Sequence, residues 1–189
     1  STYSLALEKD YINWSSMILN YAIYHNGKLW PQNSDGTHGS KKNVTVQYAI
    51  QKSFNTVPVR IITEMLGVNE AYNFMKKTFH LSTLDDTNDA SIAPLATGSL
   101  TNGVTTVEMA AAYAVFGNNG YYYKPYCYYK VTNATGTEVL LETKSEPEKV
   151  LSEDTAEVMR ELLKTVPARS FRSSKNLGKF ELMSKTGTT

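Results

Sequence analysis

The 189 residues of this chain are enough for one domain with a hydrophobic core, and 41% hydrophobic with 20% charged residues is ordinary for a globular protein. A formal net charge of +1 argues against a dedicated nucleic-acid or membrane-surface binder. The single cysteine, Cys127, excludes an intramolecular disulfide, and we expect it to be buried as a small hydrophobe. The three histidines lack metal-ligand spacing, so we expect neither a metal nor a cofactor.

The first half of the chain is predicted to be largely helical. Residues 1–8 have the pattern of the end of a helix, and the proline and glycine residues in 28–39 predict a loop. A helix is predicted after Thr45 as N-cap, followed by a second that Thr56 caps and Gly67 ends. Asn69 is the predicted cap of a third helix, which runs to about Phe79, and residues 82–91 are predicted to be a polar loop.

The second half alternates strong helix signals with strand signals. Thr105 and Glu108 form a capping-box pattern before an alanine-rich helix, which we expect to be buried and central. Residues 126–131 and 138–141 predict the two strands of a hairpin. Ser152 is the predicted cap of another amphipathic helix, and a basic, serine-rich loop over 169–178 leads to a final strand.

Two short motifs far apart in the chain point to chemistry. Lys185-Thr186-Gly187 closes a short apolar run, which is typical of an edge strand that carries a cation and a hydroxyl and leaves room for a ligand at the glycine. Such an arrangement suits a carboxylate ligand. Ser53-Phe54-Asn55 is a weak signal alone, because such tripeptides often serve as caps or turns. Together, and in this order, they correspond to two of the three parts of the signature Ser-x-x-Lys, Ser-Asp-Asn and Lys-Thr-Gly, with Phe54 at the middle position of the second.

Four stretches extend this match over nearly the whole chain: residues 30–39, 49–55, 98–113 and 185–188. With them the chain resembles the transpeptidase domain of the penicillin-binding proteins, and more closely the bifunctional class A kind. The resemblance implies an α+β fold, mainly helical, with a hairpin and a terminal strand that carries Lys-Thr-Gly. It also implies a D,D-transpeptidase that cross-links peptidoglycan stem peptides through a serine acyl-enzyme, which β-lactams also form.

The resemblance assigns roles to particular residues. Ser53 is implied to act as a proton relay beside the nucleophile, and Lys185 to border the same cleft as its catalytic partner. The residues implied in binding the substrate amide and the terminal carboxylate are Asn55, Thr186, Gly187 and Thr188. Because a proton relay needs hydrogen-bond reach, we expect Ser53, Asn55 and Lys185 to converge on one cleft.

The chain also departs from the family pattern. No Ser-x-x-Lys occurs within residues 1–189, so the nucleophile is expected a few residues upstream of Ser1, with further strands and a helix downstream. We therefore expect an interior part of a transpeptidase domain that is inactive alone. The resemblance suggests a membrane-anchored parent protein with a glycosyltransferase domain, acting on the extracytoplasmic face of the bacterial membrane. This chain has no predicted transmembrane or signal segment.

Two alternative functions remain open from the residues alone. One is a β-lactamase or β-lactam sensor related to the same family, although hydrolysis needs an added deacylation base that the sequence does not reveal. The other is a non-catalytic scaffold that binds the cell wall. A Ser-x-x-Lys directly upstream of Ser1 in the parent gene would favour the enzyme, and its absence would exclude catalysis.

Overall fold

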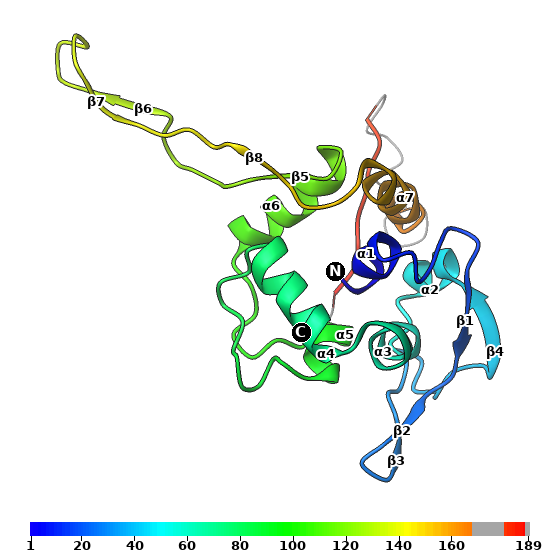
Figure 1. Ribbon diagram of the computed structural model, residues 1–189. Coiled ribbons are helices and arrows are strands. Elements are labelled where there is room, and N and C mark those ends of the chain that lie inside the picture. Colours follow the sequence, from blue (N-terminus) through cyan, green and yellow to red (C-terminus); the bar gives the residue numbers. More distant parts are fainter. Residues whose placement is uncertain (168–179, 188–189) are drawn as a thin grey trace.

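Short helices pack around a central helix, α1, and two-stranded ladders lie at the edges of the molecule (Figure 1). The computed structural model describes residues 1–167 and 180–187. The helical segments, of which η1 and η2 are π-helical, are α1 (Thr2–Glu8), α2 (Val46–Lys52), α3 (Thr56–Ile61), η1 (Ile62–Leu66), α4 (Val68–Asn73), η2 (Phe74–Thr78), α5 (Ile92–Thr97), α6 (Thr106–Gly117) and α7 (Glu153–Lys164). The strands are β1 (Met17–Asn20), β2 (Ile23–His25), β3 (Lys28–Trp30), β4 (Lys42–Thr45), β5 (Tyr121–Tyr123), β6 (Lys130–Thr132), β7 (Val139–Glu142) and β8 (Pro147–Lys149). The expected mixed α+β, mainly helical fold is confirmed.

The hydrophobic core lies between α1 and the helices around it. Ala6 in α1, Ile61 in α3 and Leu162 in α7 are completely buried, and α1 contacts both neighbouring helices. Full burial of an aliphatic side chain such as Ile61 contributes about 1.5–3 kcal/mol. An isolated helix of seven residues would not be stable in water, so α1 is held in place by this packing.

Three helix starts predicted from local sequence are confirmed. The hydroxyls of Thr45, Thr105 and Ser152 each accept a backbone N–H in the first turn of α2, α6 and α7. At α6 the carboxylate of Glu108 also accepts from the N–H of Thr105, which completes the capping box. The Ser152 N–H and hydroxyl in turn donate to the Glu8 carboxylate, at 2.9 and 2.8 Å, and thereby join the end of α1 to the start of α7.

Glu108 provides a test of this capping in solution. Hydrogen bonds from Ser82 and Thr105 lower the pKa of its carboxyl to about 2. A lowered folded-state pKa gives stability that is present above the unfolded value near 4.5 and is lost as pH falls toward 2. We expect Glu108→Gln to lower the free energy of unfolding at pH 7 by about 1–2 kcal/mol, after discounting for solvent screening. Glu146→Gln, an exposed control, should change little.

The measurement is thermal and urea unfolding of wild type and both variants between pH 7 and pH 2. The difference between wild type and Glu108→Gln should shrink as pH falls from about 4.5 toward 2, because the Glu108 carboxylate of the unfolded wild-type chain takes up a proton in this range while that of the folded protein stays charged. A difference that stays constant over this range would show that the charge of Glu108 does not stabilise the cap.

Two strand pairings occur around the stretch 28–39, for which the sequence predicts a loop. β1 pairs antiparallel with β4, and β2 pairs antiparallel with β3. Residues 28–30, expected to be loop, are therefore the strand β3, and the loop proper begins after Trp30. Neither pairing has a local signature, because each short strand is specified by its partner rather than by its own residues. The β1–β4 ladder fixes the start of α2, which follows β4 directly.

Residues 121–149 form an arm that projects from the helical body (Figure 1). β5 pairs with β8 at its base, and β6 pairs with β7 further out, both antiparallel. The predicted hairpin is confirmed, with strand limits a few residues from those expected. Cys127, expected to be buried, is exposed, because this stretch of the arm lies away from the packed helices.

Several predicted helix limits need correction. Thr56 is the first residue of α3 and not its cap, and Asn69 lies inside α4, whose N-cap is Gly67. Residues 92–97, for which the sequence predicts no element, form α5. The alanine-rich helix α6 is buried on one side only, since Met109 is 41% exposed. Within the described part of the C-terminal segment, residues 180–187, no strand is assigned. The predicted loop over 169–178 lies outside the described residues.

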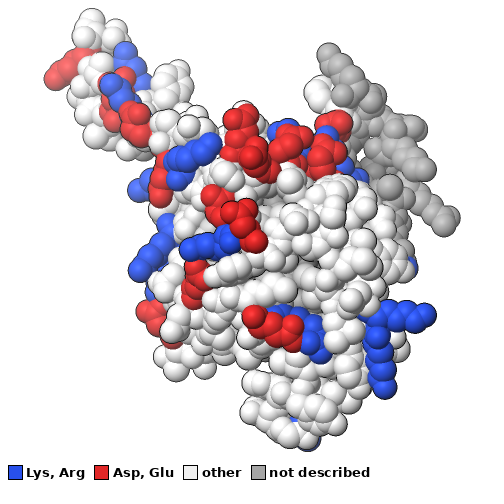
Figure 2. Space-filling view, turned by 45° about the vertical axis from the view of Figure 1, so that its right-hand side comes forward, with Lys and Arg blue, Asp and Glu red and all other residues white. Residues whose placement is uncertain are grey.

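The surface carries charges of both signs. On the face shown in Figure 2, acidic and basic side chains are both present on the body and on the arm. Within residues 1–167 and 180–187, the helices are all too short or too polar to span a membrane.

Candidate functional site

The Ser53–Asn55 turn joins α2 to α3. Ser53 is the C-cap of α2, with φ 55° and ψ 45°, in the left-handed region that non-glycine residues rarely occupy. Holding a serine there costs about 1 kcal/mol and requires support from surrounding contacts. Phe54 gives part of that support, since its ring packs edge-to-face on Tyr48 at 5.7 Å between centroids and touches the core.

Lys185 meets this turn across 132 residues of sequence. Its Nζ donates to the Ser53 hydroxyl oxygen at 2.7 Å and to the Thr186 carbonyl oxygen at 3.0 Å. The segment that carries Lys185 runs beside the end of α7, where the Ser184 N–H donates to the Leu163 carbonyl oxygen at 3.4 Å. The predicted meeting of Ser53 and Lys185 is therefore observed, although the segment 180–187 forms no strand.

Burial lowers the pKa of the Lys185 ammonium below its ordinary value. The physical cause is desolvation, which penalises the charged form of a partly buried amine. Lys185 therefore loses its positive charge at a lower pH than an exposed lysine does. A charged Lys185 donates to the Ser53 oxygen, which leaves the Ser53 proton free to point toward another acceptor.

Asn55 lies in the same turn, and its side chain is bound by the loop after β3. Its Nδ2 donates to the Gln32 carbonyl oxygen at 2.8 Å, and its backbone N–H donates to the Asn33 Oδ1, also at 2.8 Å. The loop after β3 therefore supports the turn that carries Ser53. The sequence gives no indication of this support, because residues 32–33 and 55 are far apart in the chain.

The remaining predicted substrate-binding residues stand at the solvent side of the site. Thr186 and Gly187 are exposed, and a Cβ at Gly187 would meet no atom within 4 Å. This open space agrees with the expectation that a ligand can approach the backbone there. Thr188 lies outside the described residues.

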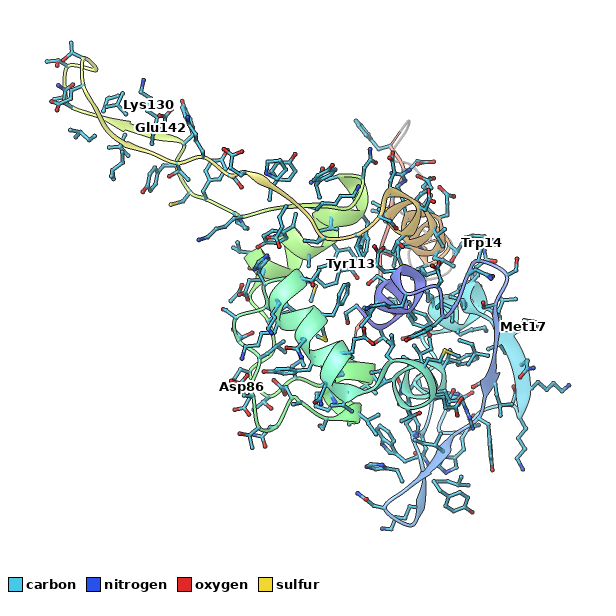
Figure 3. All side chains as sticks on the ribbon, in the orientation of Figure 1. Trp14, Met17, Asp86, Tyr113, Lys130 and Glu142 are labelled. Atoms are coloured by element: carbon cyan, nitrogen blue, oxygen red, sulfur yellow. The ribbon has the colours of Figure 1, made fainter. Side chains whose placement is uncertain are left out.

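A largely apolar cavity of about 500 Å³ adjoins Lys185. Side chains from α1, α2, α6 and α7 line it, among them Tyr3, Ile50, Tyr113, Phe116, Met159 and Leu163. Tyr113 lies on the side of α6 that faces α1 (Figure 3). Burial raises the pKa of Tyr3, whose hydroxyl has no hydrogen-bond partner among the described residues. The aromatic lining was not predicted, because its residues come from helices that sequence patterns cannot place side by side.

The described residues contain no group of three His, Cys, Asp or Glu side chains that could hold a metal ion. The groups that the site presents are a hydroxyl, an ammonium and backbone carbonyls. A serine hydroxyl beside a desolvated ammonium is suited to proton transfer and to the binding of an anionic substrate group.

Comparison with known proteins agrees with these features. The family model described as penicillin binding protein transpeptidase domain matches residues 2–189. The chain belongs to this family of transpeptidase domains. Penicillin-binding protein 1A of Clostridium acetobutylicum is 40% identical over 97% of this chain, and penicillin-binding protein 1A of Streptococcus pneumoniae is 30% identical over 90%. The resemblance to the class A kind is thereby confirmed, and the chain spans 22% and 25% of those two relatives.

Solved structures show the same fold. The D,D-transpeptidase domain of a peptidoglycan glycosyltransferase from Eggerthella lenta matches with a TM-score of 0.77 at 20% identity, over 99% of this chain and 51% of that one. The imipenem acyl-enzyme complex of penicillin-binding protein A from M. tuberculosis matches with a TM-score of 0.80 at 19% identity, over 99% of this chain and 46% of that one. At these identities the likeness establishes the fold alone.

Proposed function

We propose that this chain forms the part of a D,D-transpeptidase that holds Ser53 and Lys185 beside the reacting serine. The observation that carries the proposal is the 2.7 Å hydrogen bond from Lys185 Nζ to Ser53 Oγ, which unites the two motifs. Support comes from the family match over residues 2–189 and from the shared fold with a D,D-transpeptidase domain and with the imipenem acyl-enzyme of a penicillin-binding protein.

In this proposal the substrates are peptidoglycan stem peptides, and β-lactams acylate the same serine. The nucleophilic serine attacks the penultimate carbonyl of the donor stem peptide and forms an ester, while the terminal D-residue leaves as an amine that takes up a proton. As the amide C–N bond breaks, Ser53 passes the proton given up by the nucleophilic hydroxyl on to the leaving nitrogen, and the Lys185 ammonium keeps the Ser53 oxygen in place by donating to it. An amino group of a second stem peptide then attacks the ester and releases the serine.

Lys185 also favours the neutral form of a catalytic lysine placed nearby, because two ammonium groups in one partly buried site repel each other. That lysine and the nucleophile belong to a Ser-x-x-Lys motif, which residues 1–189 do not contain. We propose that the parent protein supplies it upstream of Ser1 and that the parent is membrane-anchored, carries a glycosyltransferase domain and acts on the extracytoplasmic face.

The substrate carboxylate is proposed to bind at Thr186 and Thr188, with Asn55 on the substrate amide. The exposure of Thr186 and the open space at Gly187 support this placement. The terminal carboxylate of the stem peptide and the carboxylate of a β-lactam would both approach along the exposed side of the segment that carries Lys185, whose charge attracts them.

Covalent labelling tests the location of the nucleophile. We expect no adduct when the 189-residue chain is incubated with a penicillin, because a hydroxyl without an adjacent base is a poor nucleophile. The full-length parent should gain one penicillin mass under the same conditions. Intact-mass spectrometry reads both results. An adduct on the 189-residue chain that Ser53→Ala abolishes would place the nucleophile within this chain and overturn the relay role. A parent protein that takes up no penicillin would instead favour the non-catalytic scaffold.

A further inference from the structure

Helix α3 begins without a cap of its own. The residue at its N-cap position, Asn55, makes no side-chain bond to the first turn, since its amide nitrogen donates to the Gln32 carbonyl oxygen. The cap comes instead from Asn33, whose Oδ1 accepts the N–H of Asn55 at 2.8 Å and the N–H of Thr56 at 3.2 Å. A residue 22 positions upstream therefore holds the backbone that follows Ser53.

Asn33 is itself held inside the protein. Its side chain is only 4% exposed, and its Nδ2 donates to the Asn20 Oδ1 at 3.2 Å. The same Asn20 oxygen accepts the hydroxyl of Thr56 at 2.6 Å, and Thr56 is completely buried. Buried polar groups of this kind have strong orientational preferences, because a lost partner leaves a desolvated donor or acceptor.

Asn20 connects this network to the β1–β4 ladder. Its Nδ2 donates to the Ser40 hydroxyl at 3.4 Å, and its carbonyl oxygen accepts the Lys41 N–H at 3.0 Å. Gly39 has φ +95°, and a Cβ there would lie 2.4 Å from the Asn20 carbonyl oxygen, so only glycine lets the loop approach this closely. Gly39 thus lets the loop lie directly against Asn20 and the hydrogen bonds that Asn20 makes.

We propose that Asn33 is a positioning residue for the reaction, acting through the Ser53–Asn55 turn. By accepting two consecutive N–H groups it fixes the backbone after Ser53 and so keeps the Ser53 hydroxyl within reach of Lys185. This inference rests on the proposed function, because it needs Ser53 to take part in acyl transfer. Asn33 accepts from the backbone N–H groups of Asn55 and Thr56 and from the Thr56 hydroxyl, and within residues 1–167 and 180–187 no hydrogen bond joins it to Ser53 or Lys185.

The expected effect follows from the precision that proton transfer requires. Ser53 already lies in the left-handed region, so releasing the N–H groups of Asn55 and Thr56 lets the turn relax toward ordinary dihedral angles. A displacement of about 1 Å in a catalytic group can cost about 10²-fold in rate. In the full-length protein, Asn33→Ala should lower the rate constant of the acylation step with a fluorescent penicillin by about 10- to 100-fold. The dissociation constant of the preceding non-covalent complex should change little.

Two further variants separate positioning from general stability. Asn33→Asp keeps an oxygen that can accept both N–H groups, and in its protonated form its hydroxyl replaces the Nδ2 that donates to Asn20. Assayed at about pH 5, where a buried carboxyl is neutral, it should acylate within about 5-fold of wild type at the same pH. Asn133→Ala is the matched control, because the Oδ1 of Asn133 also accepts two backbone N–H groups, those of Thr137 and Glu138, at 3.0 and 3.3 Å. Asn133 directly follows β6 in the arm. Figure 3 shows that Lys130 and Glu142 of the arm lie far from Tyr113, which lines the cavity beside Lys185. The Asn133→Ala substitution should leave acylation at the wild-type rate.

The measurement is stopped-flow acylation of the four full-length proteins, with thermal unfolding recorded for each. The proposal is supported if the acylation rate constant decreases from wild type through Asn33→Asp to Asn33→Ala, and if that of Asn133→Ala equals that of wild type. An acylation rate constant of folded Asn33→Ala within 3-fold of wild type would overturn it. A rate constant of Asn33→Asp as low as that of Asn33→Ala would overturn it as well. Should Asn33→Ala not fold, Asn33→Ser takes its place with the same expected order, since its shorter hydroxyl cannot reach both N–H groups. If wild type itself is not acylated, the proposed function fails instead.

Discussion

Replacing Lys185 with alanine in the full-length protein is expected to lower the rate constant for acylation by penicillin by about 10²–10⁴-fold. Such a loss is the scale of removing one positioned proton-transfer or charge-stabilising group. The reason lies in the 2.7 Å contact with Ser53, because without the ammonium the hydroxyl loses its donor. The lysine proposed upstream of Ser1 would also lose the like charge that favours its neutral form. Lys130→Ala, on the arm away from the site, is the control and should acylate normally (Figure 3). An effect of Lys185→Ala smaller than 10-fold would remove Lys185 from the chemistry.

The pH dependence of the same reaction tests the charge of Lys185. Burial lowers the pKa of this ammonium, so its charge is lost as pH rises through a value below that of an ordinary lysine. As pH rises, the acylation rate constant should therefore begin to decline at a lower pH than it would if Lys185 were an exposed lysine. Lys185→Arg keeps its charge at high pH, since the guanidinium does not deprotonate in proteins. Its acylation should be slower than wild type but should lack that decline. An identical alkaline decline in both proteins would assign the titration to another group.

Ser53→Ala carries the second large expected effect. Removing the hydroxyl should lower the acylation rate constant by about 10²–10⁴-fold, the usual contribution of general acid–base catalysis. The free energy of unfolding should change by about 0.5 kcal/mol or less, because Ser53 is only partly buried and alanine fits the same space. Fluorescent-penicillin labelling and thermal unfolding of the full-length protein measure the two quantities.

Ser145→Ala is the control for Ser53→Ala. Ser145 lies in the arm, where its hydroxyl donates to the Lys124 carbonyl oxygen, so the same chemical change is made away from the site. Wild-type acylation by Ser53→Ala would exclude the relay role. Equal losses in Ser53→Ala and Ser145→Ala would point to a general effect on folding.

Local signals in the sequence predicted the helix starts well. Thr45, Thr105 with Glu108, and Ser152 each cap the first turn of the helix that follows them, and this chemistry needs only residues three or four positions apart. The hairpin of the arm was predictable for the same reason, since its turn joins neighbouring strands.

Features that depend on distant partners were not predictable in this way. Strand β1 finds its partner β4 more than twenty residues away, as the Met17–Thr45 pair shows, and neither strand has a strong pattern of its own. Asn33 was part of a motif that carried the family resemblance, yet its role as the cap of α3 appears only when the loop is folded against the turn. The meeting of Ser53 with Lys185 was expected from the resemblance and not from spacing.

The most direct test of the account is a double-mutant cycle on Ser53 and Lys185 in the full-length protein. The acylation rate constant is measured for wild type, Ser53→Ala, Lys185→Ala and the double variant. Groups that act as one unit through a hydrogen bond lose their effects together, so the double variant should be about as slow as the slower single variant. A double variant whose loss equals the product of the two single losses would show that Ser53 and Lys185 act independently and would contradict the account.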